Sequence, residues 1–174
     1  MFIGASPELL VRRAGRKVFL NPLAGSAARC VNPADDERAA QALLASDKDR
    51  REHAIVIDAI ERVLRPLCRS LTIPAAPSVT ATDALWHLST EIEGELAEPC
   101  PSSLALAVAL HPTPAVCGYP LQAARHAISQ WEPFDRGLFA GFIGWMTADG
   151  DGEWAVSLRC AQIKEDEAVL YAGA

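Results

Sequence analysis

The first third of the chain contains both strand-like and helix-like patterns of apolar residues. Residues 2–13 and 17–25 are rich in strand-forming side chains and flank the turn sequence AGRK, which predicts an antiparallel hairpin. Residues 35–46 have the spacing of a short amphipathic helix. Residues 47–65 predict one long helix, because Ser46 can cap it and acidic side chains occupy its first turn.

The middle of the chain contains two helical patterns separated by a proline-rich turn. Residues 101–110 are almost entirely apolar and predict a buried helix, which the following HPTP sequence ends because proline cannot donate a helical hydrogen bond. Residues 120–132 predict the next helix, with Pro120 in its first turn. Residues 84–96 fit a helix or a strand on pattern alone.

The last third of the chain has the pattern of β structure. Residues 137–146, 153–163 and 168–174 are strand-like, and the segments between them, TADGDG and KEDE, are typical of tight turns. We therefore predict a three-stranded antiparallel meander over residues 138–172.

Composition narrows the class of protein. The 174 residues are 50% apolar and 22% charged, as in an ordinary globular domain, and the net charge of −6 indicates no basic surface for nucleic acid. Five widely spaced cysteines without a C-x-x-C pair indicate packed thiols in a reducing compartment. No apolar run reaches the ~18 residues of a membrane span, and the N-terminus lacks a signal-peptide pattern. We expect a cytoplasmic protein.

Both ends of the chain have strand-like sequence without a polar leader, MFIGASPELLVRR at the start and AVLYAGA at the end. The ends of a domain usually carry a few loosely held residues. We therefore expect residues 1–174 to be part of a larger domain.

Two glutamates occupy positions where a carboxylate needs an explanation. At ~100° per residue, Glu52 heads an apolar helical stripe that continues through Val56 and Ile60. It could reach solvent or pair with a nearby arginine, or it could be a buried acid or a ligand for a hard cation. Glu8 follows Pro7 in an apolar strand, where simple alternation could place it in water.

Arg159 lies in a strand-like run with Ala155, Ser157 and Ala161 predicted on the same face. These small neighbours leave room for the guanidinium to bind an anion, in a two-point contact with a carboxylate. A cross-strand ion pair with an acidic residue is the alternative.

Gly25 and Ser26 follow a strand, where glycine lets backbone N–H groups approach an anionic ligand and the hydroxyl adds a donor. Many ordinary turns have the same composition. His53, His87 and His126 lack the spacing of metal ligands, so we expect them to pack or to face water.

Seven segments together resemble the chorismate-utilising enzymes, a family that includes isochorismate synthase, salicylate synthase and the large subunits of anthranilate and aminodeoxychorismate synthase. They occur in the family's order and spacing and cover essentially the whole chain. The segments are FIGASPELL, PLAGSAAR, SDKDRREHAIVIDAI, LHPTPAVCGYP, GLFAGFIGW, GEWAVSLRCAQI and LYAGA. HPTPAVCG is similar to the isochorismate synthase form, particularly that of siderophore pathways, whereas ammonia-using members carry a different turn.

The resemblance implies roles for the candidate residues. In this family, water adds at C2 of chorismate, a dianion, and the C4 hydroxyl leaves. Glu8 matches the general acid that protonates the leaving hydroxyl, a role that suits a pKa raised by burial. Glu52 matches a carboxylate that holds Mg²⁺, and the metal in turn binds the ring carboxylate. The residues that match substrate-binding positions are Gly25, Ser26, His111, Arg159 and Gly173.

The resemblance also implies an α+β fold, a chorismate-binding α/β sandwich with antiparallel sheets and outer helices. In that fold "ALWHLST" is a strand and Arg159 faces the ligand cleft. The family's water-activating lysine lies upstream of the SPE segment, and a second magnesium glutamate and a substrate-binding lysine lie beyond Ala174. We therefore expect residues 1–174 to be an incomplete catalytic domain that does not turn over chorismate alone.

The implied function is the Mg²⁺-dependent conversion of chorismate to isochorismate, for siderophore or menaquinone biosynthesis, by a protein that is monomeric when complete. Two alternatives remain open. One is a salicylate synthase, which would also eliminate pyruvate, and the other is a non-catalytic, truncated paralogue that acts as a binding module.

Overall fold

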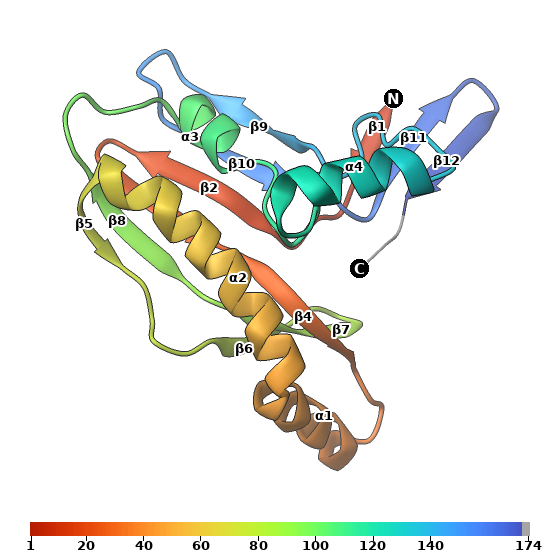
Figure 1. Ribbon diagram of the computed structural model, residues 1–174. Coiled ribbons are helices and arrows are strands. Elements are labelled where there is room, and N and C mark those ends of the chain that lie inside the picture. Colours follow the sequence, from red (N-terminus) through yellow and green to blue (C-terminus); the bar gives the residue numbers. More distant parts are fainter. Residues whose placement is uncertain (172–174) are drawn as a thin grey trace.

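The computed structural model describes residues 1–171, in which twelve strands form three antiparallel sheets accompanied by four α-helices (Figure 1). The strands are β1 (Phe2–Gly4), β2 (Leu9–Ala14), β3 (Lys17–Asn21), β4 (Leu23–Ala28), β5 (Cys68–Thr72), β6 (Ser78–Ala81), β7 (Leu85–Ser89), β8 (Ile92–Leu96), β9 (Phe142–Met146), β10 (Gly152–Val156), β11 (Cys160–Lys164) and β12 (Glu167–Tyr171). The helices are α1 (Pro33–Ala45), α2 (Asp47–Leu64), α3 (Ser103–Leu110) and α4 (Leu121–Trp131), and a 3₁₀ turn (Arg65–Leu67) follows α2. The architecture is α+β, as expected.

The chain passes from one sheet to another through short connections, which we call crossings. The six-stranded sheet has the order β5-β8-β3-β2-β10-β9, and the two three-stranded sheets have the orders β4-β7-β6 and β1-β11-β12. The β2–β3 hairpin confirms the first prediction. Residues 84–96 are strands, β7 and β8, and therefore agree with the family pattern. Few residues separate β1 from β2, β3 from β4, β7 from β8 and β10 from β11, so the chain changes sheets abruptly at each of these points.

Helix α2 confirms the prediction for residues 47–65 and provides one wall of the core. Ser46 caps it by accepting a hydrogen bond from the Asp49 N–H. Its buried side chains are His53, Val56, Ile60 and Leu64, which lie at helical spacing on one face. The last three join a core cluster with side chains of α3 and of strands β2, β3, β8 and β10. Each fully buried aliphatic side chain of this kind contributes roughly 1.5–3 kcal/mol.

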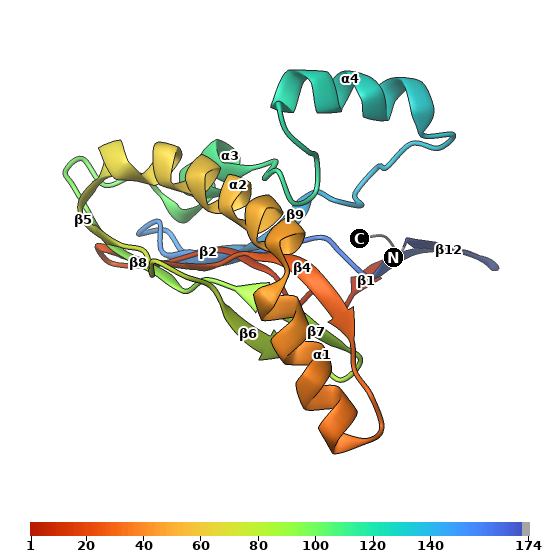
Figure 2. The ribbon, with the colours of Figure 1, turned by 60° about the horizontal axis from the view of Figure 1, so that its bottom comes forward.

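Helices α1, α3 and α4 form close to the predicted ranges: α1 begins two residues earlier than expected, α3 two residues later and α4 one residue later. Pro120 is the N-cap of α4 and lies just outside the first turn. Helix α4 has no fully buried residue, and Figure 2 shows it standing apart from the sheets. None of the described helices has the length and apolar character needed to cross a bilayer. All five cysteines are free thiols, but the prediction of packed thiols is only partly confirmed: Cys160 is buried, Cys68, Cys100 and Cys117 are half-buried, and Cys30 is exposed.

The predicted meander over residues 138–172 is wrong. Strands β9 and β10 form a hairpin in the six-stranded sheet, whereas β11 and β12 form a hairpin in a different sheet with β1. The run 153–163 is broken after Val156, and Arg159 has a φ of 45° at the corner. No glycine or proline marks this break, because it is caused by pairing with distant segments: Ser157 exchanges backbone hydrogen bonds with Ala140 and Gly141.

Candidate functional site

Glu8 lies in the crossing between β1 and β2 and is 3% exposed. Its backbone is fixed at both ends, because its carbonyl accepts from Val156 N–H at 3.1 Å and its N–H donates to Ser6 Oγ at 3.3 Å. Burial raises the pKa of the Glu8 carboxyl from 4.5 to about 7, and a hydrogen bond from the Leu23 backbone opposes this rise. Glu8 therefore does not face water, and it carries an available proton near neutral pH.

Arg159 lies on the same antiparallel ribbon as Glu8. Ala5 N–H donates to the Arg159 carbonyl at 3.1 Å. This contact lies three residues before Glu8 on one segment and three residues after Val156 on the other, so the two segments run antiparallel. The guanidinium has no acidic side chain within 4.0 Å among residues 1–171, so the alternative of a cross-strand ion pair is not observed. A left-handed φ costs a non-glycine residue about 1–2 kcal/mol. The backbone at Arg159 adopts this conformation, and no carboxylate among residues 1–171 cancels the positive charge of its guanidinium.

His87 connects two of the predicted substrate-binding residues. Its Nδ1 lies 2.8 Å from Ser26 Oγ, and its Nε2 lies 3.1 Å from Arg159 Nη2. Because a guanidinium can only donate, Nε2 must be the acceptor, and the proton of the neutral ring is on Nδ1 and points to Ser26. Burial and the adjacent Arg159 charge lower the pKa of His87, which favours this neutral form.

The importance of His87 was missed in the sequence. We expected it to pack or to face water, and it does pack, but it also joins β4 to the Arg159 corner. Ser26 and His87 are directly opposite each other in the β4–β7 pairing, although 61 residues separate them in the chain. Only knowledge of that pairing could have identified the contact.

Gly25 allows α2 to lie close to β4. Its φ is 91°, and a Cβ at this position would come within 3.1 Å of Asp49 Cβ and 3.2 Å of Leu88 Cδ1. A side chain would therefore be strained and would push the first turns of α2 away from the strand. His53 holds the same contact, because its Nδ1 lies 3.0 Å from the Ala24 carbonyl oxygen.

Glu52 does not head the buried stripe of α2, so that part of the helical-wheel interpretation is wrong. The stripe is headed by His53, and the Glu52 side chain next to it is 55% exposed, with its Oε1 3.3 Å from Lys48 Nζ. The ordinary reading, in which Glu52 reaches solvent and pairs with a cation, describes this geometry, although the partner is a lysine and not an arginine. Within residues 1–171, no three His, Cys, Asp or Glu side chains gather as metal ligands.

His111 anchors the proline-rich turn and is not joined to the other candidates by a described contact. Its backbone N–H caps α3, and its Nε2 donates to the Ala140 carbonyl at 2.7 Å. Its ring meets Phe142 edge-on, with 5.2 Å between the ring centroids. His111 thus fixes the turn against the segment before β9. Gly173 lies outside the described residues.

The chain was compared with known proteins. A family model described as "Chorismate binding enzyme" matches residues 1–174. The isochorismate synthase DhbC of Bacillus subtilis is 55% identical over 172 residues, which are 99% of this chain and 43% of that protein. The crystal structure of DhbC from Bacillus anthracis superposes with a TM-score of 0.90 at 54% identity, covering 97% of this chain and 44% of that one. MenF, the menaquinone-specific isochorismate synthase of Escherichia coli, also gives a TM-score of 0.90, at 33% identity, covering 99% and 40%. The chain thus spans less than half the length of these relatives.

Proposed function

Because the chain belongs to the family of chorismate-binding enzymes, we propose that the complete protein is a Mg²⁺-dependent isochorismate synthase. It adds water at C2 of chorismate and releases the C4 hydroxyl. The observation that carries the proposal is one antiparallel ribbon that holds both a buried acid with a pKa of about 7, Glu8, and a guanidinium with no acidic partner among residues 1–171, Arg159. The similarity to the isochorismate synthase DhbC and to the menaquinone-specific isochorismate synthase MenF supports the same reaction.

Glu8 acts as the general acid. Its carboxyl proton passes to the C4 oxygen of chorismate as the bond from C4 to that oxygen breaks, and the oxygen departs as water. A carboxyl group with an ordinary pKa of 4.5 would hold almost no proton at neutral pH, whereas one with a pKa of about 7 is protonated in about half of the molecules. Burial therefore provides what the step requires.

Arg159 binds a carboxylate of the chorismate dianion. His87 accepts one of its N–H groups and so fixes the plane of the guanidinium, while the other N–H groups remain able to donate. Since His87 is neutral, it adds no charge that would compete with Arg159 for the substrate. Ser26, held by the other ring nitrogen, lies in the same row of polar groups.

Glu52 would contribute one ligand to the metal. A single exposed carboxylate suits Mg²⁺, which commonly keeps several waters and binds one or two protein carboxylates together with its substrate. The ion would supply positive charge that offsets the repulsion between the Glu52 carboxylate and a substrate carboxylate, which for two such charges 4 Å apart is about 4 kcal/mol at an effective dielectric of 20. The lysine pair of Glu52 is exposed and weak, so it does not prevent metal binding.

The product would feed siderophore or menaquinone biosynthesis in the cytoplasm, and the complete protein would be a monomer. A salicylate synthase shares the residues above and would differ in its product. Incubation of the complete protein with chorismate and Mg²⁺, followed by chromatography, distinguishes the two: isochorismate supports the proposal, and salicylate with pyruvate supports the alternative. If neither appears while chorismate still binds, the protein is a binding module.

Two substitutions test the assigned roles in the complete protein. Glu8→Gln should reduce kcat by about 10²–10⁴-fold with little change in KM, and added Mg²⁺ should not restore it. Glu52→Gln should weaken Mg²⁺ binding, and excess metal should restore part of the activity. Glu91→Gln, at an exposed glutamate in the turn between β7 and β8, is the matched control. Rescue of Glu8→Gln by metal, or normal Mg²⁺ affinity of Glu52→Gln, would show that the two carboxylates are misassigned.

A further inference from the structure

Strand β4 contains a bulge opposite β7. Leu23 pairs with Ser89, whereas Ser26 pairs with His87, so two residues of β4 stand opposite one residue of β7. A bulge of this kind interrupts the ladder and bends the strand. Because a shift of one residue moves a side chain to the other face of a sheet, the position of the bulge decides which residues of β4 reach the site.

Groups on both sides of this bulge belong to the candidate site. On one side, the Leu23 N–H donates to the Glu8 carboxyl. On the other side, Ser26 lies opposite His87, which in turn contacts Arg159. If the bulge moved by one residue along β4, Ser26 would no longer face His87. The position of the bulge therefore sets the surroundings of the acid and of the arginine together.

A buried imidazole ties the bulge to α2. His53 of α2 is 2% exposed, and its Nδ1 lies 3.0 Å from the carbonyl oxygen of Ala24, which is one of the two bulge residues. Since a carbonyl can only accept, Nδ1 must carry a hydrogen and donate it. Gly25, the other bulge residue, lets α2 come close enough for this contact.

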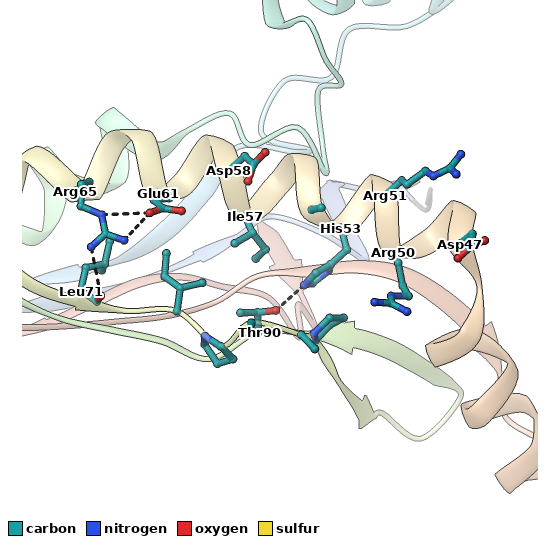
Figure 3. Close-up of a pocket in the computed structure, with 16 residues that line it drawn as sticks. Asp47, Arg50, Arg51, His53, Ile57, Asp58, Glu61, Arg65, Leu71 and Thr90 are labelled. Carbon is teal, nitrogen blue, oxygen red and sulfur yellow. Dashed lines mark hydrogen bonds and ion pairs between the residues drawn. The ribbon is translucent and has the colours of Figure 1, made fainter.

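The second ring nitrogen of His53 is also used. Figure 3 shows the ring pointing from α2 toward Thr90, which is buried in the turn between β7 and β8, and the distance from Nε2 to Thr90 Oγ1 is 2.7 Å. Burial lowers the pKa of His53 and favours the neutral ring, so Nε2 accepts and the Thr90 hydroxyl donates. With both nitrogens used in these contacts, His53 can influence Glu8 and Ser26 only through the backbone that it holds.

We propose that His53 is a positioning residue: by donating to the carbonyl in the β4 bulge, it fixes the bulge in place and keeps Leu23 beside Glu8. The same contact keeps Ser26 opposite His87. The inference rests on the proposed function, because it assigns a role in that reaction to a side chain outside the reacting groups. A histidine that only filled space would matter through its volume, whereas the positioning role depends on the donor at Nδ1.

Two substitutions in the complete protein separate these roles. His53→Asn provides an amide N–H at the place of Nδ1, whereas the longer side chain of His53→Gln provides one at the place of Nε2 and leaves the Ala24 carbonyl without its donor. His53→Gln should lower kcat/KM for chorismate about 10-fold at saturating Mg²⁺, because a buried acceptor loses its partner. His53→Asn should stay within about 3-fold of the wild type. If His53 only fills space, the smaller asparagine side chain will be the more damaging change.

Hydrogen exchange tests the bulge independently of the reaction. Mass spectrometry of peptides that contain Leu23 should show faster amide exchange in His53→Gln than in the wild type, and no such change in His53→Asn, because the Leu23 N–H is protected only while it binds Glu8. A wild type that produces no isochorismate would contradict the proposed function alone, since the exchange rates would still decide the role of His53.

Thr90 offers a second pair of variants that changes no atom of α2 or β4. Thr90→Val keeps the volume but removes the donor to Nε2, so it should lower kcat/KM about 3-fold, whereas Thr90→Ser keeps the hydroxyl and should not. This pair decides the question if the His53 variants do not fold. Equal effects of His53→Asn and His53→Gln, unchanged Leu23 exchange in His53→Gln, or equal effects of the two Thr90 variants would overturn the inference.

Discussion

The burial of Glu8 should cost the protein stability, and the size of that cost can be measured. At about 1.4 kcal/mol for each pKa unit, a rise from 4.5 to about 7 destabilises the folded state by about 3 kcal/mol once both states are ionised. Below pH 4.5 the carboxyl is protonated whether the chain is folded or not, and the cost is absent. Between these values the unfolded chain releases its proton first, so stability falls as pH rises.

Glu8→Gln removes this cost while keeping the shape of the side chain, because the amide oxygen can still accept from the Leu23 N–H. The variant should exceed the wild type in free energy of unfolding by about 1 kcal/mol at pH 5.5 and by about 3 kcal/mol at pH 8.5. Urea unfolding followed by circular dichroism at a series of pH values gives this difference. Glu91→Gln, at an exposed glutamate, should show no such growth with pH. A pH-independent difference for Glu8→Gln would refute the raised pKa and, with it, the assignment of Glu8 as an acid near neutral pH.

Three further predictions concern residues around the site. Gly25→Ala should destabilise the protein more than Gly15→Ala, since both have positive φ but only Gly25 would bring a Cβ against Asp49. The free energies of unfolding of the two variants, measured in urea, should differ by more than about 1 kcal/mol. Hydrogen bonds from Arg29 and other donors hold the pKa of the Asp36 carboxyl well below its usual range. The ionised carboxyl therefore stabilises the fold above pH 3.8, and this stabilisation is lost as pH falls through the lowered pKa of the folded state. Asp36→Asn should lower the Tm near pH 7 and much less at acid pH. His87→Phe in the complete enzyme should raise KM for chorismate at least 10-fold through the freed guanidinium, whereas an unchanged KM in steady-state assays would contradict the positioning role.

Local sequence pattern predicted the elements but not the places where they separate. Helix α2 and the β2–β3 hairpin depend on caps, turns and periodicity within a few residues, and the structure confirms both. The break after Val156 depends instead on which distant segments pair with residues 157–159, and strand propensity is similar on either side of it. For Glu52, helical periodicity gave the correct angle between its side chain and that of Val56. The buried face of α2, however, is centred on the row that begins at His53, so Glu52 lies beside it.

Four of the candidate residues share a structural position that explains why pattern alone could not assemble them. Glu8 lies where the chain leaves one sheet for another, Arg159 lies at a second such crossing, and Gly25 and Ser26 lie just after a third. At these crossings the regular ladder of backbone hydrogen bonds stops, so side chains and amides become available for other partners; the Leu23 N–H, for example, binds the Glu8 carboxyl. Of these residues Glu8 alone is buried, whereas Ser26 and Arg159 are exposed. A carboxyl group that must hold a proton at neutral pH needs such a place, enclosed enough to raise its pKa and irregular enough to leave room for a substrate.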